Sequence, residues 1–299
     1  MAIAWVFPGQ GSQKLGMAEV VLELPGARER FQEASELLGR DLLAICAGSV
    51  PSGSPEPHDL HDTRNTQPAL FVIESVLAGA LQAQGRQPDL MAGHSLGELV
   101  ALHAAGVFDF STGLALMQRR SELMAAAGGG AMTAVMGFDR DALEACVAAT
   151  EGVVIANDNS SAQVVLSGAP EAVAAVSSQL SCKRAIPLAV SGAFHSPFMA
   201  EAAAAFAAAL EAVPFADAAI PVLSNTDPSP ETSGAALKAR LRRQMTSPVR
   251  WRETMERFGA EGITTSVEIG PGNVLSGLIK RSGAGITTAQ IASTADLGL

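Results

Sequence analysis

Short apolar runs alternate with longer amphipathic stretches along the first 125 residues of the chain. The apolar runs at 3–7 and 90–92 have the length of buried strands. Apolar residues recur at helical spacing over 26–38 and 67–81, whereas the polar, proline-rich residues 48–66 predict a surface loop. Such alternation is typical of a parallel sheet with helices on both faces. We therefore predict that the chain begins with a doubly wound α/β core.

The pattern changes after the glycine run at 128–130. Strand and helix patterns then follow in the order β-α-β-β-α-β, which is that of a ferredoxin-like split unit. The predicted strands are 131–137, 153–157, 163–167 and 184–190, and the predicted helices are 140–149 and 170–180. We therefore predict an α/β-hydrolase-like large subdomain, made of 1–127 and 191–299, and a small ferredoxin-like subdomain inserted at 128–190.

The end of the chain returns to the pattern of the large subdomain. Helices are predicted at 199–212, 234–245 and 250–258, strands at 220–224 and 266–269, and loosely ordered residues from 292 onward.

Composition and charge narrow the class of protein. The 299 residues, 48% hydrophobic and 17% charged, can bury a full core. No apolar run approaches the roughly 18–20 residues of a membrane span, and the N-terminal run predicts a first strand rather than a signal peptide. The net charge of −10 disfavours nucleic acid and anionic membranes. The three cysteines lack metal-ligand spacing, so we expect reduced thiols in a cytoplasmic protein without a metal.

One turn carries the strongest chemical signal. Gly93-His94-Ser95-Leu96-Gly97 spells G-x-S-x-G between an apolar run and a helical pattern. A serine on a sharp strand-to-helix turn needs glycines beside it, because a side chain there would collide with neighbouring backbone. Such a turn exposes the hydroxyl next to the N–H groups of a helix N-terminus, which can stabilise an oxyanion. We predict that Ser95 is a nucleophile, with a structural turn serine as the alternative.

A serine nucleophile needs a base, and histidine is the usual one. His195 follows the predicted strand at 184–190 and a glycine, and sites in open α/β sheets lie at the C-terminal ends of strands. The other histidines have less suitable settings. His58 and His61 lie in a polar loop, and His103 lies on a helix that must pack. His94 directly precedes the nucleophile, and we expect it to shape the pocket. We predict that His195 is the base, with a capping or core histidine as the alternative.

A third group normally orients such a histidine. Asp139 and Asp158 stand between Ser95 and His195, but both fall in the predicted small subdomain. The sequence therefore predicts a Ser–His dyad whose histidine N–H is held by a backbone carbonyl.

Arg120 has only apolar residues at three and four positions on either side. These neighbours are Leu116, Met117, Leu123 and Met124. Arg120 must therefore emerge on the packed face of its helix, where a guanidinium needs an anionic partner. The pattern leaves two interpretations open, an internal salt bridge and a bidentate clamp on a substrate carboxylate.

Several motifs occur together over nearly the whole chain. They are Phe7-Pro8-Gly9-Gln10-Gly11-Ser12-Gln13, Thr66-Gln67-Pro68-Ala69, Gly93-His94-Ser95-Leu96-Gly97-Glu98, Arg120, Ala193-Phe194-His195-Ser196 and Glu268-Ile269-Gly270-Pro271-Gly272. In type and order they resemble those of the malonyl-CoA:acyl-carrier-protein transacylases of type II fatty-acid synthesis, which are similar to the acyltransferase domains of polyketide synthases.

The resemblance implies a role for each matching residue. These are Ser95 as the malonyl-carrying nucleophile, His195 as general base and then acid, the backbone N–H groups of Gln10 and Leu96 as the oxyanion hole, Arg120 as partner of the malonyl carboxylate, Gln244 as donor of the carbonyl that orients His195, and Asn157 and Phe194 as substrate-binding residues. The implied substrates are malonyl-CoA and a holo acyl carrier protein, and no metal or other cofactor is implied.

The implied carrier protein is usually acidic, and this chain is acidic as well, so docking needs a local basic patch. Positive charge concentrates late in the chain, at Lys238, Arg240, Arg242, Arg243, Arg250, Arg252, Arg257, Lys280 and Arg281. We hypothesise that the carrier docks near Lys238, Arg240, Arg242 and Arg243, with ordinary solvated helix faces as the alternative. We expect a monomer that binds neither nucleic acid nor a membrane.

Other functions remain open at this stage. A serine hydrolase such as a thioesterase or lipase shares the G-x-S-x-G turn at 93–97, which is called a nucleophile elbow. Such a hydrolase normally adds an acid before the histidine and lacks a buried arginine. A malonyl transferase that loads a malonate decarboxylase would use the same chemistry with another carrier. A non-catalytic scaffold is disfavoured by the intact Ser95, His195 and Arg120.

Overall fold

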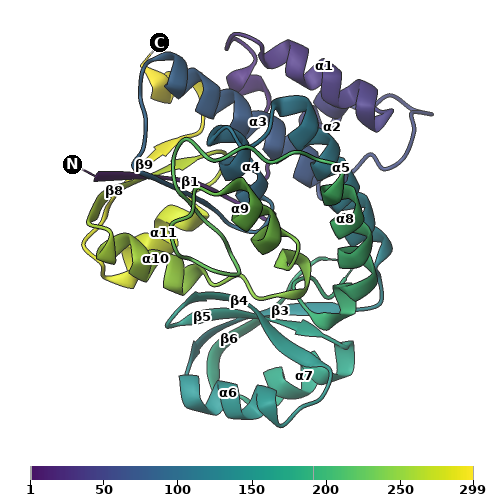
Figure 1. Cartoon of the computed structure of the whole chain (residues 1–299). Helices are drawn as coiled ribbons and strands as arrows, with labels where there is room; N and C mark the ends of the chain where they lie inside the picture. The colour runs from purple at the N-terminus through teal and green to yellow at the C-terminus, as the bar shows by residue number, and fades with distance from the viewer. Residues whose placement is uncertain (1, 191, 299) are drawn as a thin grey trace.

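The computed structural model describes residues 2–190 and 192–298, and its elements gather around two separate sheets (Figure 1). The larger sheet has the strand order β7-β2-β1-β8-β9, and all neighbouring strands are parallel. Its strands are β1 (Ala2–Phe7), β2 (Leu90–Gly93), β7 (Val222–Leu223), β8 (Ile263–Ile269) and β9 (Thr287–Ile291). The predicted parallel core is confirmed.

Alternate residues of β1 face opposite sides of this sheet, as the period of a strand requires. Trp5 and Phe7 belong to one buried apolar cluster, whereas Ala4 and Val6 belong to a second. The first cluster includes residues of α1 (Ala27–Leu38), α2 (Leu42–Ala47), α3 (Thr63–Ala83), α4 (Gly97–Ala104), α5 (Phe110–Ala126), α8 (Ala200–Glu211) and α9 (Gly234–Leu241). The second includes residues of α10 (Trp251–Ala260) and α11 (Val274–Ser282). Helices therefore cover both faces of the sheet.

The smaller sheet is antiparallel and has the order β4-β5-β3-β6. Its elements are β3 (Ala131–Phe138), α6 (Arg140–Ala148), β4 (Val153–Ser160), β5 (Gln163–Gly168), α7 (Pro170–Gln179) and β6 (Cys182–Pro187). Both helices lie on the outer face of this sheet (Figure 1), over a core that includes Val135, Leu143 and Val176. The element order is the ferredoxin-like one that was predicted. The subdomain limits 1–127, 128–190 and 191–299 stay a prediction, and residues 1, 191 and 299 lie outside the described residues.

Strand β4 connects the small sheet to the rest of the molecule. The Asp158 N–H donates to the Val249 carbonyl at 2.9 Å, and the Val249 N–H donates to the Ala156 carbonyl at 2.8 Å. The Asp158 carboxylate pairs with Arg252 of α10 at 3.0 Å and with Arg140 of α6 at 2.9 Å. Asp158 is thereby occupied away from His195, as predicted for both candidate acids, and Asp139 caps the N-terminus of α6.

Helix α3 begins earlier than predicted. The sequence pattern predicted a start at Gln67-Pro68. Instead Asp62 caps the helix, and residues 63–66 of the predicted loop form its first turn. Pro68 cannot donate to the carbonyl of Arg64, but Arg40 Nη2 donates to that oxygen at 2.9 Å. The helix therefore tolerates an internal proline because a distant side chain replaces the missing donor.

The end of the chain is more ordered than predicted. α11 and β9 were not predicted from the sequence, and the predicted helix over 234–245 is divided into α9 and a separate 3₁₀ turn. Residues 293–298 are not loose, because Ser293 and Asp296 form a capping box and Leu297 is buried, and residue 299 lies outside the described residues. The 3₁₀ turns of the chain are η1 (Glu19–Val21), η2 (Pro197–Met199), η3 (Gln244–Thr246) and η4 (Thr294–Leu297). Within the described residues, no helix is long and apolar enough to cross a bilayer.

Candidate active site

Ser95 lies on a sharp turn between β2 and α4, with a backbone φ of +54°. The two glycines of the motif are required by close backbone contacts. A Cβ on Gly93 would lie 1.9 Å from the carbonyl carbon of Gly97, and a Cβ on Gly97 would lie 2.2 Å from the carbonyl oxygen of Phe7. A larger residue at Gly97 would push the turn away from β1, and one at Gly93 would push the end of β2 away from the start of α4. The predicted strand–turn–helix setting of the serine is therefore present.

Ser95 Oγ lies 2.7 Å from His195 Nε2. His195 Nδ1 lies 2.9 Å from the carbonyl oxygen of Gln244. A carbonyl can only accept, so it fixes the proton on Nδ1 and leaves Nε2 free to accept from the serine hydroxyl. His195 is 3% exposed and has a φ of +56°. Within 2–190 and 192–298, Ser95 and His195 are the only non-glycine residues with a left-handed backbone.

The electrostatic surroundings keep His195 neutral. Burial, together with the nearby positive charge of Arg120, lowers the pKa of the imidazole to about 3. The Gln244 carbonyl acts in the opposite direction, since it stabilises the protonated ring. A histidine with such a pKa is an unprotonated base at neutral pH.

Arg120 emerges from α5 into the interior and is 0% exposed. Its Nη1 donates to Gln67 Oε1 at 2.7 Å. Its Nη2 donates to Ser95 Oγ and to Gln244 Oε1, both at 3.0 Å. Burial lowers the pKa of Arg120 to about 10, with Glu98 opposing the shift, so the side chain is still a cation at pH 7. Among the described residues, Arg120 forms no ion pair, and its hydrogen-bond acceptors are neutral.

A cavity of about 80 Å³ lies beside these groups. Its lining includes residues that were expected in the pocket: Gln10, Ser95, Leu96, Asn157, Phe194 and His195. Neither the backbone N–H of Gln10 nor that of Leu96 donates to another described residue. Two N–H groups beside a nucleophile are what an oxyanion hole requires.

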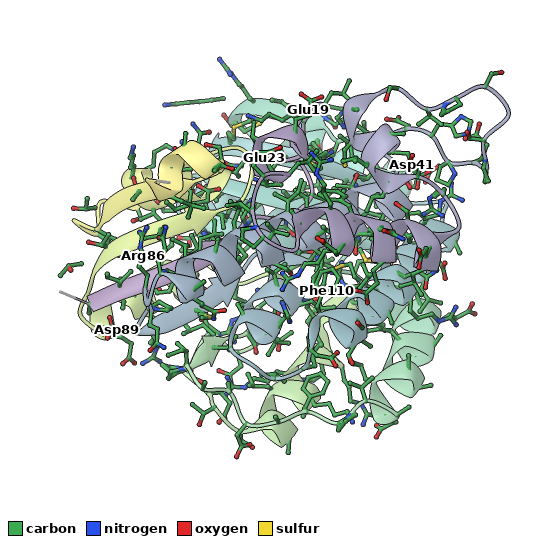
Figure 2. The ribbon with its side chains drawn as sticks, turned by 90° about the horizontal axis from the view of Figure 1, so that it is seen from above. Glu19, Glu23, Asp41, Arg86, Asp89 and Phe110 are labelled. Atoms are coloured by element: carbon green, nitrogen blue, oxygen red, sulfur yellow. The ribbon has the colours of Figure 1, made fainter. Side chains whose placement is uncertain are left out.

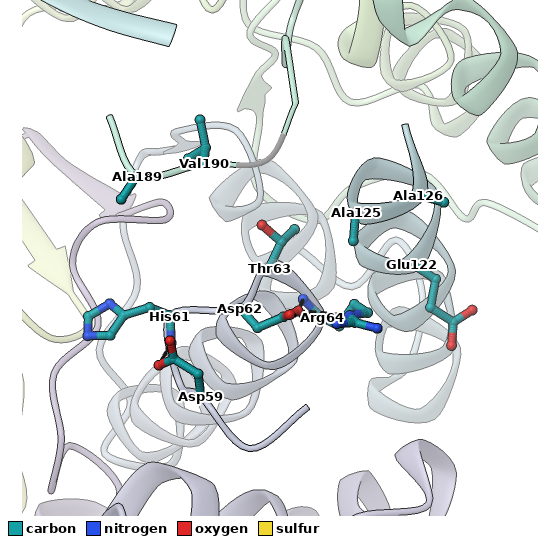
Figure 3. Close-up of a pocket in the computed structure, with 10 residues that line it drawn as sticks. All are labelled: Asp59, His61, Asp62, Thr63, Arg64, Glu122, Ala125, Ala126, Ala189 and Val190. Atoms are coloured by element: carbon teal, nitrogen blue, oxygen red, sulfur yellow. Dashed lines mark hydrogen bonds and ion pairs between the residues drawn. The ribbon is translucent and has the colours of Figure 1, made fainter. Parts of the chain in front are cut away.

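A larger cavity of about 620 Å³ adjoins the catalytic one. Figure 3 shows Ala189 and Val190 on one side of this cavity and Asp62, Thr63 and Arg64 of the α3 start on another. Val190 lines both cavities, and the Thr63 hydroxyl is 3.1 Å from the side-chain nitrogen of Gln10. Val190 and the contact between Thr63 and Gln10 therefore link the linings of the two cavities.

Comparison with known proteins identifies the family. The sequence matches the acyl transferase domain family over residues 4–296. The chain belongs to the acyl transferase domain family. It is 50% identical over 297 residues to the malonyl CoA-acyl carrier protein transacylase of Synechocystis, covering 99% of both chains.

Solved structures agree with this membership. The crystal structure of the Synechocystis malonyl-CoA:ACP transacylase has a TM-score of 0.94 and 49% identity, covering 100% of this chain and 99% of that one. A malonyl-transacylase in complex with its type II polyketide acyl-carrier protein has a TM-score of 0.90 and 40% identity, covering 99% and 98%. Both likenesses extend over the whole acyl transferase fold.

The other histidines lie where their sequence settings indicated. His94 lines the catalytic cavity, and its Nε2 lies 2.8 Å from Asn159 Oδ1. His103 packs against the rings of Phe71 and Phe110, in a structural position. His58 is half-buried and His61 is exposed, and both remain in the segment before α3.

The predicted basic patch is smaller in the structure. Arg240 pairs with Asp227 at 3.0 Å and with Glu231 at 3.5 Å. Lys238 Nζ donates to the carbonyl of Val213 at 2.9 Å. Arg240 and Lys238 are therefore engaged by groups of the protein itself. Of the four residues predicted for carrier docking, Arg242 and Arg243 are exposed. Arg242 pairs with Glu211.

Three buried polar side chains of the site had no predicted side-chain role: Gln67, Glu98 and Gln244. The first two lie within recognised motifs, so the motif was a signal, but nothing in the local pattern gives their partners. Asn225, which lies two residues after β7, was not predicted at all, although its side chain forms hydrogen bonds with the turn at residues 93–95. No periodicity or spacing in the sequence distinguishes it from a turn residue.

Proposed function

We propose that this acyl transferase moves a malonyl group from malonyl-CoA to the phosphopantetheine thiol of an acyl carrier protein, in fatty-acid synthesis. The observation that carries the proposal is the hydrogen bond from Arg120 Nη2 to Ser95 Oγ. A buried cation beside the nucleophile favours an acyl group that brings its own carboxylate. The names of the relatives, malonyl CoA-acyl carrier protein transacylases, support the same substrates.

In the first half-reaction, Ser95 Oγ attacks the thioester carbonyl while His195 Nε2 takes the hydroxyl proton. The negative charge that develops on the carbonyl oxygen is stabilised by the backbone N–H groups of Gln10 and Leu96. The intermediate then collapses, the carbon–sulfur bond breaks, and the coenzyme A thiolate takes the proton back from His195. The product is a malonyl ester on Ser95.

In the second half-reaction, the thiol of the carrier attacks this ester after His195 has taken its proton. Collapse breaks the bond to Ser95 Oγ, which recovers the proton. Each half-reaction exchanges a thioester for an ester or the reverse, so no atom is oxidised or reduced. Ser95 and His195 perform the bond exchange and the proton transfers, so the proposed reaction needs no cofactor.

Arg120 would discriminate between acyl groups. A malonyl carboxylate would neutralise its buried charge, whereas an acetyl group would leave that charge without a counter-ion in a dry cavity. Asn157 and Phe194 would complete the pocket, since both line the cavity around Ser95.

An acyl carrier protein is the second substrate in this proposal. The related malonyl-transacylase solved with its carrier protein supports such a partner. We place the docking surface near Arg242 and Arg243, which are exposed cations. The side of the molecule opposite the small sheet suits an acidic partner less well, because it presents Glu19, Glu23 and Asp41 (Figure 2).

Mass spectrometry after mixing with malonyl-CoA tests the function directly. We expect the peptide that contains Ser95 to gain the mass of one malonyl group, and the Ser95→Ala variant to gain none. Adding a holo carrier should remove the group from Ser95 and move it to the carrier thiol. A serine hydrolase would instead release free malonate rapidly without an acceptor, and a scaffold would gain no mass.

A further inference from the structure

We infer that Asn225 is a positioning residue that holds Ser95 in the conformation needed for attack; the inference builds on the proposed function. Asn225 follows β7 and is 1% exposed. Its Oδ1 accepts from the Ser95 N–H at 2.8 Å, and its Nδ2 donates to the Gly93 carbonyl at 2.6 Å. One amide therefore binds the elbow on both sides of His94.

These two bonds act on the strained part of the turn. A left-handed backbone is unfavourable for any residue with a Cβ, and Ser95 has one. The Gly93 carbonyl and the Ser95 N–H belong to the two peptide units that adjoin the Cα atom of His94, so fixing both restricts rotation of one unit against the other. Without Asn225, the turn could relax and move Ser95 Oγ away from His195 Nε2, with which it is in contact at 2.7 Å.

Asn225 is itself fixed by a buried carboxylate. Its backbone N–H donates to Glu98 Oε2 at 3.0 Å, and Glu98 is 0% exposed in the first turn of α4. Gln244 Nε2 donates to the same oxygen at 2.7 Å and to the Ser95 carbonyl at 2.9 Å. We call Asn225, Glu98 and Gln244 the elbow clasp. The clasp thus binds both the N–H and the carbonyl of the nucleophile.

The clasp also reaches the other two functional groups. The Gln244 carbonyl accepts from His195, and its side-chain oxygen accepts from Arg120. Among the described residues, Asn225 forms no hydrogen bond with either of these side chains, and it does not line the catalytic cavity. Loss of Asn225 should therefore slow attack on every acyl group equally, whereas loss of Arg120 should affect the malonyl group most.

The test compares two variants that each lose a buried amide. Asn225→Ala removes both elbow bonds. Asn65→Ala is the matched control, because Asn65 is 0% exposed and its Nδ2 donates to the carbonyls of Pro57 and Asp59, in the segment before α3 and away from the elbow. Both variants should lose stability in urea unfolding. Asn225→Ser, which also removes the two bonds, replaces Asn225→Ala if the latter does not fold.

The rate is read with a fluorophosphonate as well as with malonyl-CoA and acetyl-CoA. The fluorophosphonate forms a bond from Ser95 Oγ to phosphorus and releases fluoride, while His195 takes the serine proton. We expect the Asn225 variant to react about 10²-fold more slowly with all three reagents, as a small misplacement of a reacting group produces. KM for the thioesters should stay near the wild-type value, and Asn65→Ala should keep wild-type rates.

The outcomes separate this inference from the proposed function. Wild-type rates in the Asn225 variant, or a loss confined to malonyl-CoA, would overturn the positioning role. An equal loss of rate in the Asn65 control would also overturn it, because the effect would then be general destabilisation. A wild-type protein that reacts with the fluorophosphonate but not with malonyl-CoA would contradict the proposed function and leave the role of Asn225 intact.

Discussion

The guanidinium of Arg120 donates a hydrogen bond to the hydroxyl of Ser95 over 3.0 Å. In the same structure that hydroxyl contacts His195, so a cation and a base meet at one oxygen. The cation has a second effect, because its charge lowers the pKa of the His195 imidazole. In the proposed function, substrate selection and base strength are therefore coupled through a single arginine.

Arg120→Ala should lose its preference for malonyl while it retains acetyl transfer. The substitution removes the proposed partner of the malonyl carboxylate, a side chain that is fully buried. Removing one partner of a buried charge pair costs about 2–5 kcal/mol, so kcat/KM for malonyl-CoA should fall by about 30- to 4000-fold. The measurement is kcat/KM for malonyl-CoA and acetyl-CoA side by side. Equal losses for the two thioesters would contradict the clamp.

The pH dependence of acylation should reflect the low pKa of His195. Burial and the Arg120 charge both disfavour the imidazolium, so the base stays unprotonated well below the ordinary pKa of about 6.5. The value of kcat/KM for acetyl-CoA should thus stay level as the pH falls from about 8 to about 5. In Arg120→Ala the cation is absent, so the pKa of His195 rises and the acid limb moves to higher pH. An acid limb at the same pH in both proteins would argue against this coupling.

Two glycine substitutions should have opposite effects on stability. Gly97→Ala places a Cβ 2.2 Å from the Phe7 carbonyl oxygen, so we expect strong destabilisation and loss of Ser95 acylation. Gly259→Ala is the control in α10, where a Cβ meets nothing within 4 Å. There alanine should stabilise the protein by about 0.5–1 kcal/mol, because it is the better helix former. Urea unfolding measures both; wild-type stability and acylation in the Gly97→Ala variant would disprove the steric argument.

Charge reversal at Arg242 and Arg243 should weaken the second half-reaction only. The double variant Arg242→Glu, Arg243→Glu would repel an acidic carrier, so KM for the carrier should rise and its salt dependence should change. Acylation by malonyl-CoA should keep its wild-type rate, since neither residue lines the catalytic cavity. The double variant Arg28→Glu, Arg86→Glu changes the net charge by the same amount and is the control, because both arginines are exposed. Arg86 lies on the side opposite the small sheet (Figure 2). An unchanged carrier KM in the Arg242→Glu, Arg243→Glu variant would place docking elsewhere.

Local sequence patterns predicted the structure correctly wherever residues close together in the chain determine it. The G-x-S-x-G turn needs its own glycines, and the β-α-β-β-α-β order of the small sheet follows from successive elements. The start of α3 was misplaced because the missing hydrogen bond at Pro68 is compensated by Arg40, 24 residues from Arg64. A pattern confined to one helix cannot contain that contact.

The buried polar groups of the site were harder to predict for the same reason. Asn225 is 130 residues from the serine it holds and 127 residues from Glu98. Arg240 looked like part of a basic surface, but acids brought close by the fold neutralise it. The carbonyl of Gln244 was expected through the family resemblance alone, since a backbone oxygen leaves no mark in the sequence. Contacts of this kind depend on the completed fold.

The left-handed backbone at Ser95 restricts which nucleophile this fold can use. Threonine carries the same hydroxyl, but a branched Cβ at a φ of +54° is strongly unfavourable. With threonine at position 95, the backbone would have to leave the left-handed region, which would move the hydroxyl oxygen away from the imidazole of His195. Of the two alcohols that could react in this way, the shape of the main chain permits only serine.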